Sequence, residues 1–321
     1  MTRLLTIIII LLSVVLVGII LYPQIQENRP QTLRFVSDSS VVALPLLVAL
    51  EDTLFTPNRI IPEISYYSDP EKALDELFAG NIDIGIFPWS TVLNRIARRG
   101  ETLKVFMSVE FRPTLPVDAI VQPAKKKFKT IRELKGKKLG YAPILRDYIP
   151  LLLSAAGLNA KDVKLTEAPN PVLINQLTRG ELDAAWVIEP FIATIDFTKF
   201  DTISAITTKY ITAPLPAFAV GFSPVFLKKT TKIQRTRLKI ALDAAVDKID
   251  ARAADARATL GRFFFNNDSI CANTRLPQFQ RITEISKPGI QMLATRLLGA
   301  GVLSDSVDTK DIFVQPAQMM R

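Results

Sequence analysis

Apolar and polar positions repeat in the same order at two places in the chain. Residues 77–90 read LFAGNIDIGIFPWS, and residues 177–191 read LTRGELDAAWVIEPF. In both stretches an apolar stripe at helical spacing ends at a glycine, a turn containing aspartate follows, and a short apolar run precedes a proline. Glycine can adopt the left-handed conformation that ends many helices, and a continuous apolar run is typical of a strand buried on both faces. Each stretch therefore predicts helix, turn, strand and a new segment, the repeating unit of an α/β sheet.

The two stretches, called here the paired motif, share three residue types at matching positions. Leu77, Gly80 and Asp83 of the first copy correspond to Leu177, Gly180 and Asp183 of the second. Two copies of one unit predict two similar lobes, which fits a chain of 321 residues. Ligands of open α/β sheets bind where strands end and helices begin. We therefore expect the loops after the two strands, residues 88–91 and 189–191, to belong to a binding site.

The rest of the pattern alternates between strands and helices. Further strands are predicted at 33–36, 60–67, 103–109, 138–141, 163–167, 201–206 and 216–222, and further helices at 41–51, 92–100, 151–156, 238–265 and 288–298. Prolines bracket an extended segment at 117–121, which suits a crossing between lobes, and the strand at 216–222 could be the return crossing.

The N-terminal stretch is the most apolar part of the chain. Residues 4–22 read LLTIIIILLSVVLVGIILY, and no charged residue lies between Arg3 and Glu27. A run of this length can span a bilayer as a helix. No small-residue cleavage site follows it, which favours an uncleaved signal anchor over a signal peptide. Arg3 precedes the run, so residues 1–26 are predicted to anchor the chain in the cell membrane with the body extracytoplasmic.

Composition excludes several kinds of chemistry. The chain has no histidine, which removes Ser-His-Asp and Cys-His catalysis and histidine metal sites. Cys271 is the only cysteine, so neither an intrachain disulfide nor a thiolate metal cluster is expected. The net charge is +9, and the densest basic run lies at 125–138. Phe128 is the only aromatic residue within that run, which favours solvated surface over nucleic-acid binding. We therefore expect no enzyme activity, no metal, no cofactor and no nucleic-acid partner.

Several segments together resemble a known family. LPLLVALEDTLF (44–55), ALDELFAGNIDIGI (73–86), TIRELKGKKLGY (130–141), the second motif copy and VIEPF (187–191) occur in the order seen in substrate-binding proteins of ABC importers. The branch that the chain resembles handles nitrate, bicarbonate, aliphatic sulfonates, taurine and thiamine-precursor pyrimidines. The similarity covers about residues 33–195.

The resemblance implies an α/β, two-lobed type II periplasmic-binding-protein fold with two crossover strands. Lobe one would comprise residues 27–117 and 222–321, and lobe two residues 118–221. It also implies an extracytoplasmic solute-binding component with a monomeric body, which closes on a small anion or heterocycle and works with permease and ATPase subunits. A membrane-anchored sensor or interaction module is the alternative. The fold also serves a thiamine-pyrimidine synthase, but that chemistry uses a histidine.

Family pockets draw on four loops, which here are residues 37–40, 88–91, 141–148 and 189–191. The candidate ligand-binding residues are Ser37, Asp38, Ser39, Trp89, Ser90, Thr91, Tyr141, Arg146, Tyr148 and Glu189. Anion-binding members often have a Gly- and Ser-rich turn in the third loop, whose N–H groups cradle oxygens. This chain has APILRDY there, and its proline lacks an N–H.

Two kinds of ligand contact are consistent with this departure. An anion would depend on Arg146, with Ser90 and Thr91 as donors, whereas Trp89 and Tyr148 could sandwich a flat heterocycle. Other roles remain open for these side chains: packing at a lobe edge for Trp89, a surface ion pair for Arg146, and a helix N-terminal charge for Glu189.

Overall fold

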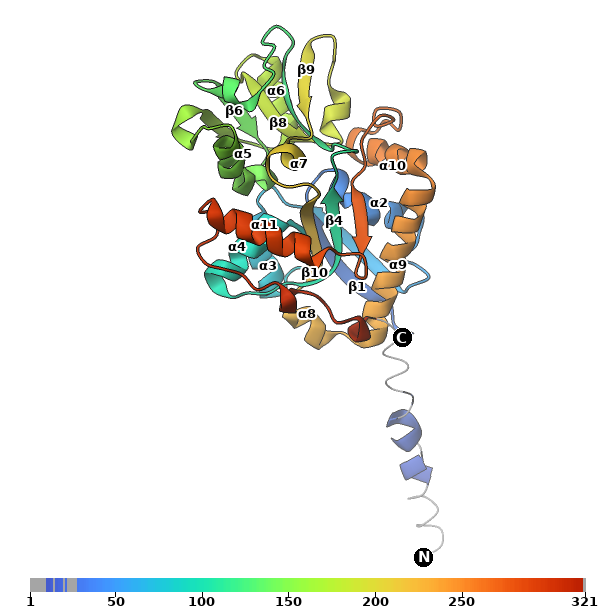
Figure 1. Ribbon diagram of the computed structural model, residues 1–321. Helices are drawn as coiled ribbons and strands as arrows, with labels where there is room; N and C mark the ends of the chain where they lie inside the picture. Colours follow the sequence, from blue (N-terminus) through green and yellow to red (C-terminus); the bar gives the residue numbers. More distant parts are fainter. Residues whose placement is uncertain (1–9, 14, 20, 22–27, 320–321) are drawn as a thin grey trace, which may run out of the picture.

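The computed structural model describes residues 10–13, 15–19, 21 and 28–319. Within these residues no helix is both long and apolar enough to cross a membrane. Part of the predicted span, residues 4–9, 14, 20 and 22, lies outside the described residues. From residue 28 onward the chain forms two α/β units, one above the other in Figure 1, each built on its own sheet.

The first sheet has six strands in the order β11-β4-β10-β3-β1-β2. Their bounds are β1 Gln31–Ser37, β2 Ile60–Tyr66, β3 Ile84–Pro88, β4 Lys104–Phe111, β10 Leu215–Phe222 and β11 Gln278–Arg281. β1 runs parallel to β2 and β3, and Phe35 lies opposite Ile64 on one side and Ile84 on the other. β10 is antiparallel to both β3 and β4. The sheet is therefore mixed, with its parallel strands at one side.

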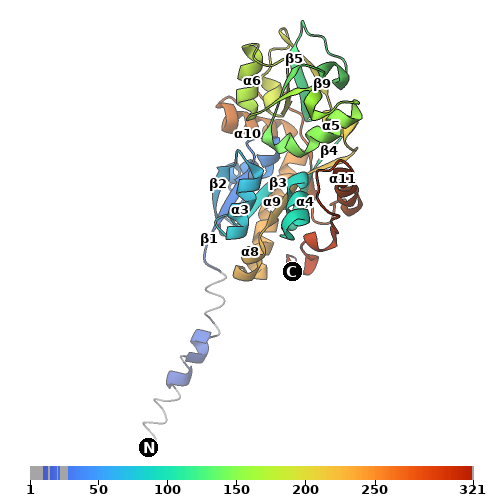
Figure 2. The same cartoon turned by 90° about the vertical axis from the view of Figure 1, so that its left-hand side faces the viewer.

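Helices cover both faces of this sheet. Their bounds are η1 Val41–Ala43, α2 Leu44–Glu51, α3 Pro70–Ala79, α4 Trp89–Arg99, α8 Pro224–Lys229, α9 Lys232–Ala251, α10 Ala253–Phe265, α11 Lys287–Gly299, η6 Lys310–Ile312 and η7 Pro316–Gln318. α2 packs against α9 and α10, whereas α4 packs against β10 and α11 (Figures 1 and 2). The apolar stripe predicted to run from 238 toward 265 forms two helices, because the backbone leaves helical geometry at Arg252, with φ −137° and ψ 61°.

The second sheet has five strands in the order β7-β6-β8-β5-β9. They are β5 Asp118–Pro123, β6 Lys138–Tyr141, β7 Lys164–Glu167, β8 Ala184–Ile188 and β9 Phe200–Ser204. Its helices are η2 Ile131–Leu134, η3 Pro143–Tyr148, α5 Ile149–Ala155, η4 Ala160–Asp162, α6 Asn170–Thr178, η5 Phe191–Thr194 and α7 Ile206–Tyr210. β6 is parallel to β7 and β8, and β5 is antiparallel to β8 and β9. The predicted α/β architecture with two sheets is confirmed.

Both copies of the paired motif form the predicted helix, turn and strand. α3 ends at Gly80, with φ +82°, and α6 is followed closely by Gly180, with φ +75°. These positive φ angles favour glycine, because a Cβ atom would strain the backbone there. β3 and β8 are each buried along their whole length. The two strands therefore lie inside their sheets, as the continuous apolar runs predicted.

The chain passes between the sheets twice, between β4 and β5 and again between α7 and β10. The sequence placed residues 215–221 in lobe two. This was wrong, because β10 pairs with β3 and β4 in the middle of the first sheet. Prolines before an apolar run fit both an extended crossing between lobes and a strand inside a sheet. Only the strands that pair with the segment distinguish these two possibilities.

Candidate functional site

The four loops predicted to form a site meet between the two sheets. β1 and β3 are parallel in the first sheet and β6 and β8 in the second, and the loops come after the carboxyl ends of these strands. The Val41 N–H donates to the Glu189 carbonyl at 2.9 Å. The Thr91 hydroxyl donates to the Asp147 carboxylate at 3.5 Å. The first bond joins the residue directly after the first loop to the fourth loop, and the second bond joins the second loop to the third.

The first loop contributes a buried carboxyl group. Burial raises the pKa of Asp38 to about 6, although the Ser40 hydroxyl and the Ser39 N–H lower it. Ser37 is buried, and its hydroxyl donates to the Asp38 carbonyl at 3.0 Å. The Asp38 Oδ2 and the Ser40 Oγ have no hydrogen-bond partner of acceptable geometry in the described chain. Ser39 is partly exposed and contributes its backbone. This loop therefore holds a buried carboxyl close to a buried hydroxyl, without a well-formed hydrogen bond between them.

The second loop contains Trp89, which belongs to the core. The predicted sandwich of a heterocycle between Trp89 and Tyr148 is wrong. The Trp89 side chain is fully buried, its Nε1 donates to Ser108 Oγ at 3.0 Å, and its ring packs against Phe313 at 6.2 Å between centroids. All of these contacts lie within the first unit. Trp89 opens α4, and its indole turns into the layer between the first sheet and the C-terminal segment.

The next residues, Ser90 and Thr91, do face the second unit. Ser90 is completely buried, and it lies close enough to Asp147 and Tyr148 to lower the pKa of each. Burial is the larger effect, and it raises the pKa of both groups. The Ser90 and Tyr148 hydroxyls nevertheless make no hydrogen bond of acceptable geometry to a described residue. This pair is the second cluster of unused polar atoms between the sheets.

The third loop does not provide a free cation. Arg146 Nε donates to Glu167 Oε2 at 2.7 Å, and Nη2 forms a second bond to the other carboxylate oxygen. The hydrogen bond to Glu167 raises the pKa of Arg146. Tyr141 lies beside the same pair, and burial together with Glu167 raises its pKa to about 12. The surface ion pair left open by the sequence is therefore the role that Arg146 takes, with Glu167 as its partner.

The fourth loop contributes Glu189, of which only 3% is exposed. Burial raises its pKa to about 7, although two backbone N–H groups lower it, those of Arg275 and Ala193, each at 3.2 Å. Glu189 lines a cavity of about 390 Å³ to which the other three loops contribute no residue. The other residues lining that cavity are Pro116, Asp118, Ala119, Ile192, Ala193, Ile195, Phe197, Thr202, Ser204, Ile270, Asn273 and Arg275.

Sequence reasoning missed three residues at this site. The buried Ser40 and the half-buried Asp147 lie in loops that the sequence identified, and the degree of burial is the property that a single sequence does not give. Arg275 lies on a segment 86 positions after Glu189, and no motif points to it. The paired motif locates the loops at strand ends, but it carries no signal for a segment that returns to the site from the far end of the chain.

The arrangement is suited to accepting hydrogen bonds. Two buried carboxyl groups, Asp38 and Glu189, and the half-buried Asp147 have raised pKa values because burial disfavours their charged forms. An unpaired buried polar atom costs free energy, so a ligand that supplies donors there is stabilised. No cluster of three or more metal-ligating side chains was found in the part of the chain that the structure covers.

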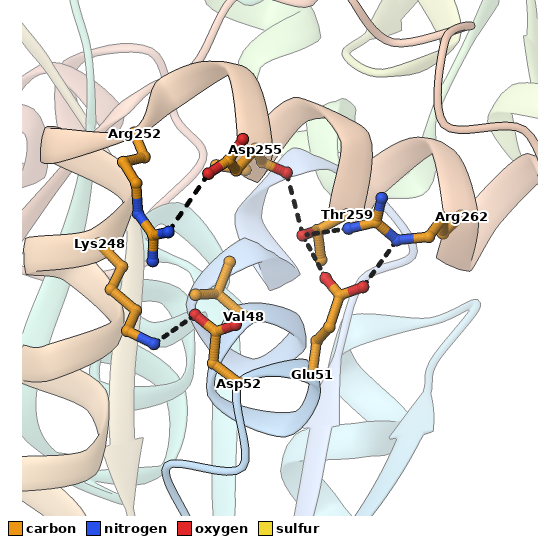
Figure 3. Close-up of a pocket in the computed structure, with 9 residues that line it drawn as sticks. Val48, Glu51, Asp52, Lys248, Arg252, Asp255, Thr259 and Arg262 are labelled. Carbon is orange, nitrogen blue, oxygen red and sulfur yellow. Dashed lines mark hydrogen bonds and ion pairs between the residues drawn. The ribbon is translucent and has the colours of Figure 1, made fainter.

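A second pocket, of about 250 Å³, lies on α2, α9 and α10 (Figure 3). Its charged side chains are paired with one another: Glu51 with Arg262, Asp52 with Lys248, and Arg252 with Asp255. Three acids balance three bases, so the pocket has no charge of its own to select a ligand. The site between the sheets is therefore the stronger candidate.

Comparisons with known proteins agree with the architecture. A family model described as NMT1/THI5 like matches residues 41–202. The chain is similar to the alkanesulfonate-binding protein SsuA of Xanthomonas axonopodis pv. citri bound to MOPS, with a TM-score of 0.71 and 17% identity over 89% of this chain and 99% of that one. A search of curated proteins found no significant match.

Two further solved structures share the fold. The periplasmic aliphatic sulphonate-binding protein SsuA of Escherichia coli has a TM-score of 0.68 and 15% identity over 91% of this chain and 100% of that one. The periplasmic nitrate-binding protein NrtA of Synechocystis PCC 6803 has a TM-score of 0.68 and 17% identity over 89% and 86%. At these identities the similarity establishes a common fold.

Proposed function

Because the chain belongs to the NMT1/THI5-like family, we propose that it is the extracytoplasmic solute-binding component of an ABC importer. It would hold a small molecule between its lobes and deliver it to permease and ATPase subunits. Structures of the same fold that are named as sulfonate- and nitrate-binding proteins support this proposal. We assign residues 27–117 and 215–321 to lobe one, residues 118–214 to lobe two, and residues 1–26 to an N-terminal membrane anchor.

The two crossings between the sheets would act as the hinge. Ligand binding then shifts the lobes toward a closed arrangement, because the ligand contacts both lobes only in that state. The bonds between Val41 and Glu189 and between Thr91 and Asp147 support such a closed arrangement, since each joins a residue of one lobe to a residue of the other. A solute would be enclosed by the same four loops.

The observation that carries the ligand class is the set of unused buried acceptors and hydroxyls at Asp38, Ser40, Ser90 and Tyr148. The Asp38 and Glu189 carboxyls accept N–H donors, and the three hydroxyls can also donate to ring nitrogens, so these groups favour a ligand that carries both kinds of nitrogen. A small anion is disfavoured, because it would meet buried carboxyl groups and because Arg146 is already paired with Glu167. We therefore favour a nitrogen heterocycle of the thiamine-precursor pyrimidine class over a sulfonate, nitrate or bicarbonate.

No enzyme activity is part of the proposal. The sequence has no histidine, and binding and release of a solute require only the acceptors and hydroxyls named above.

Isothermal titration of the purified full-length chain with 4-aminopyrimidine, ethanesulfonate and nitrate tests this function. We expect 4-aminopyrimidine to bind and the two anions to bind at least tenfold more weakly. Tyr148→Phe and Ser90→Ala should each weaken binding by about 5- to 10-fold, since each removes one hydrogen bond worth about 1 kcal/mol.

The matched control is Tyr210→Phe, which removes a phenol hydroxyl from the partly buried α7 tyrosine and should leave the affinity within about twofold. Tight binding of an anion alone would overturn the ligand class. Failure of all three compounds to bind would count against solute binding.

A further inference from the structure

β9 is an edge strand of the second sheet. It pairs with β5 on one side, and no strand of the described chain pairs with its other side. An exposed strand edge presents unpaired backbone N–H and C=O groups, which can pair with a strand from another chain. β9 lies at the end of the molecule opposite α8 in both views (Figures 1 and 2). This edge is therefore far from the helices that cover the base of the first sheet.

The pairing with β5 shows which backbone groups of β9 face outward. The Ala124 N–H donates to the Lys199 carbonyl at 2.9 Å, and the Ala205 N–H donates to the Asp118 carbonyl at 3.0 Å. Hydrogen-bonded residues alternate along an antiparallel strand. The groups of Thr202 and Ser204 consequently point away from β5, and no other backbone group of the described chain pairs with them.

A groove of about 740 Å³ follows this edge. Every residue of β9 lines it, together with Gln122, Lys127, Phe128, Lys129, Phe197 and Lys209. Phe197, which is 57% exposed, contributes an apolar side chain to the wall of the groove. The groove thus combines free backbone groups with an apolar wall, which are the two features that bind an extended peptide by β-strand addition.

The charges around the groove indicate the partner. Lys127, Lys129 and Lys209 are exposed, and none of them forms an ion pair with a carboxylate of the described chain. Lys209 lies over the ring of Tyr210, with 5.4 Å from Nζ to the centroid. Among the described residues, Asp201 is the only acid that lines the groove. Three lysines against one carboxylate leave a net positive groove, which favours an acidic partner.

We propose that the β9 edge is a docking site for an extended acidic segment of another polypeptide, which adds to the second sheet as a sixth strand. Its backbone bonds with Thr202 and Ser204, its carboxylates lie near Lys127, Lys129 and Lys209, and its apolar side chains cover Phe197. This interaction goes beyond solute binding: the groove contains no residue of the loops at 37–40, 88–91, 141–148 and 189–191, although Phe197, Thr202 and Ser204 also line the cavity beside Glu189. A failure to bind solute would leave the peptide prediction standing, because Lys127, Lys129 and Lys209 line the groove and not that cavity.

Fluorescence anisotropy with the full-length chain tests the proposal. The probe is a fluorescein-labelled octapeptide in which glutamate alternates with valine. We expect it to bind at least tenfold more tightly than a lysine–valine peptide of the same length. A version of the glutamate peptide that is N-methylated at alternate residues cannot donate hydrogen bonds to the strand edge. Its affinity should also be at least tenfold weaker. Equal binding of either control peptide, or no binding of the glutamate peptide, would overturn the proposal.

Variants of the protein give an independent check. Thr202→Pro removes an outward N–H and leaves the pairing with β5 intact, so the affinity for the glutamate peptide should fall at least tenfold. The affinity of Thr202→Val should stay within twofold of the wild type. The triple variant Lys127→Glu, Lys129→Glu, Lys209→Glu should weaken it at least tenfold. The matched triple Lys228→Glu, Lys229→Glu, Lys232→Glu on α8 and α9 should stay within twofold.

The triple variants keep the test decisive if Thr202→Pro fails to fold. Equal loss in the two triples would contradict a specific groove. Size-exclusion chromatography distinguishes the other occupant: a dimer of the chain that Thr202→Pro dissociates would overturn the proposal, since a second copy would then cover the edge. Binding of the wild-type chain to phosphatidylglycerol vesicles through the same lysines, without peptide binding, would overturn it as well.

Discussion

The two copies of the paired motif begin with the same contacts and end differently. In the first copy, Asp83 Oδ2 accepts a hydrogen bond from the Arg34 backbone N–H at 2.9 Å, and the Asp83 backbone N–H donates to the Arg34 carbonyl at 3.0 Å. In the second copy, Asp183 exchanges the same two bonds with Lys138, each at 2.9 Å. Each aspartate thus fixes its turn to the neighbouring parallel strand. The shared residues position the scaffold.

The segments after the two strands have diverged. The first strand leads directly into the eleven-residue α4, whereas the second leads through Glu189 into the four-residue η5. The first copy has no acid at the strand end, and the second has a buried one. The comparison shows that the repeated part of the motif holds the strands and that the unrepeated part supplies the binding groups. Three pairs of substitutions test this division.

The two tryptophans give the largest expected difference. Trp186 Nε1 donates at 2.8 Å to Asp118, a carboxylate that is 1% exposed, whereas Trp89 donates to the neutral Ser108. We expect Trp186→Phe to lower the free energy of unfolding by about 3 kcal/mol, because a buried carboxylate loses a donor, and Trp89→Phe by about 1 kcal/mol. Urea denaturation measures both. A larger loss for Trp89→Phe, or a weaker solute affinity in that variant alone, would contradict its assignment to the core.

The second test concerns the acid that only the second copy carries. Glu189 has an ordinary pKa of 4.5 and a folded pKa of about 7. The folded state therefore binds a proton more tightly than the unfolded state. The resulting stability is present below pH 4.5 and is lost as the pH rises through 7. The side chain in Glu189→Gln does not titrate. The free energy of unfolding of this variant, measured relative to that of the wild type, should therefore increase by about 2 kcal/mol when the pH is raised from 5 to 8.

Urea denaturation at the two pH values provides the measurement. The control is Asp201→Asn, which changes an exposed carboxylate and should leave the difference from the wild type nearly constant. If the Glu189→Gln and wild-type stabilities ran parallel from pH 5 to pH 8, the buried, proton-binding role of Glu189 would be refuted.

The smallest expected difference is between the two motif aspartates. Asp83 also accepts Arg34 Nε and Nη2, each at 2.9 Å, whereas Asp183 accepts one Lys126 ammonium at 2.7 Å. We expect Asp83→Ala to cost about 2 kcal/mol and Asp183→Ala about 1 kcal/mol, since the paired side chains are partly exposed and screened. Asp201→Ala should cost less than about 0.5 kcal/mol. If both motif variants matched that control, the aspartates would not hold the strands.

The sequence predicted the fold more fully than the site. Long apolar runs and glycine turns located β3 and β8, because burial on both faces leaves a clear pattern. β11 went unpredicted, since its four residues QFQR carry no distinctive pattern. β10 was misassigned, because prolines before an apolar run do not show which strands lie beside it.

The site was predicted at the level of loops. Strand ends located the loops at 88–91 and 189–191, and the family resemblance located those at 37–40 and 141–148, but side-chain direction depends on packing. Trp89 turned inward because Ser108 and Phe313, both distant in sequence, form its environment. Arg146 forms an ion pair with Glu167, at the end of the neighbouring strand β7. Neither partner can be identified from the local sequence.

Buried carboxyl groups between the lobes are expected to accept hydrogen bonds from the solute, and titration of the full-length chain with 4-aminopyrimidine at pH 5.5 and pH 8 is the sharpest test. Asp38 and Glu189, with pKa values of about 6 and about 7, ionise between these values, and an ionised carboxylate is the stronger acceptor. After the affinities are corrected for protonation of the ring nitrogen of the ligand, we therefore predict at least tenfold tighter binding of the neutral compound at pH 8. A solute affinity that is unchanged, or an anion that binds more tightly at pH 5.5 while 4-aminopyrimidine does not bind, would show that these carboxyl groups do not receive the solute.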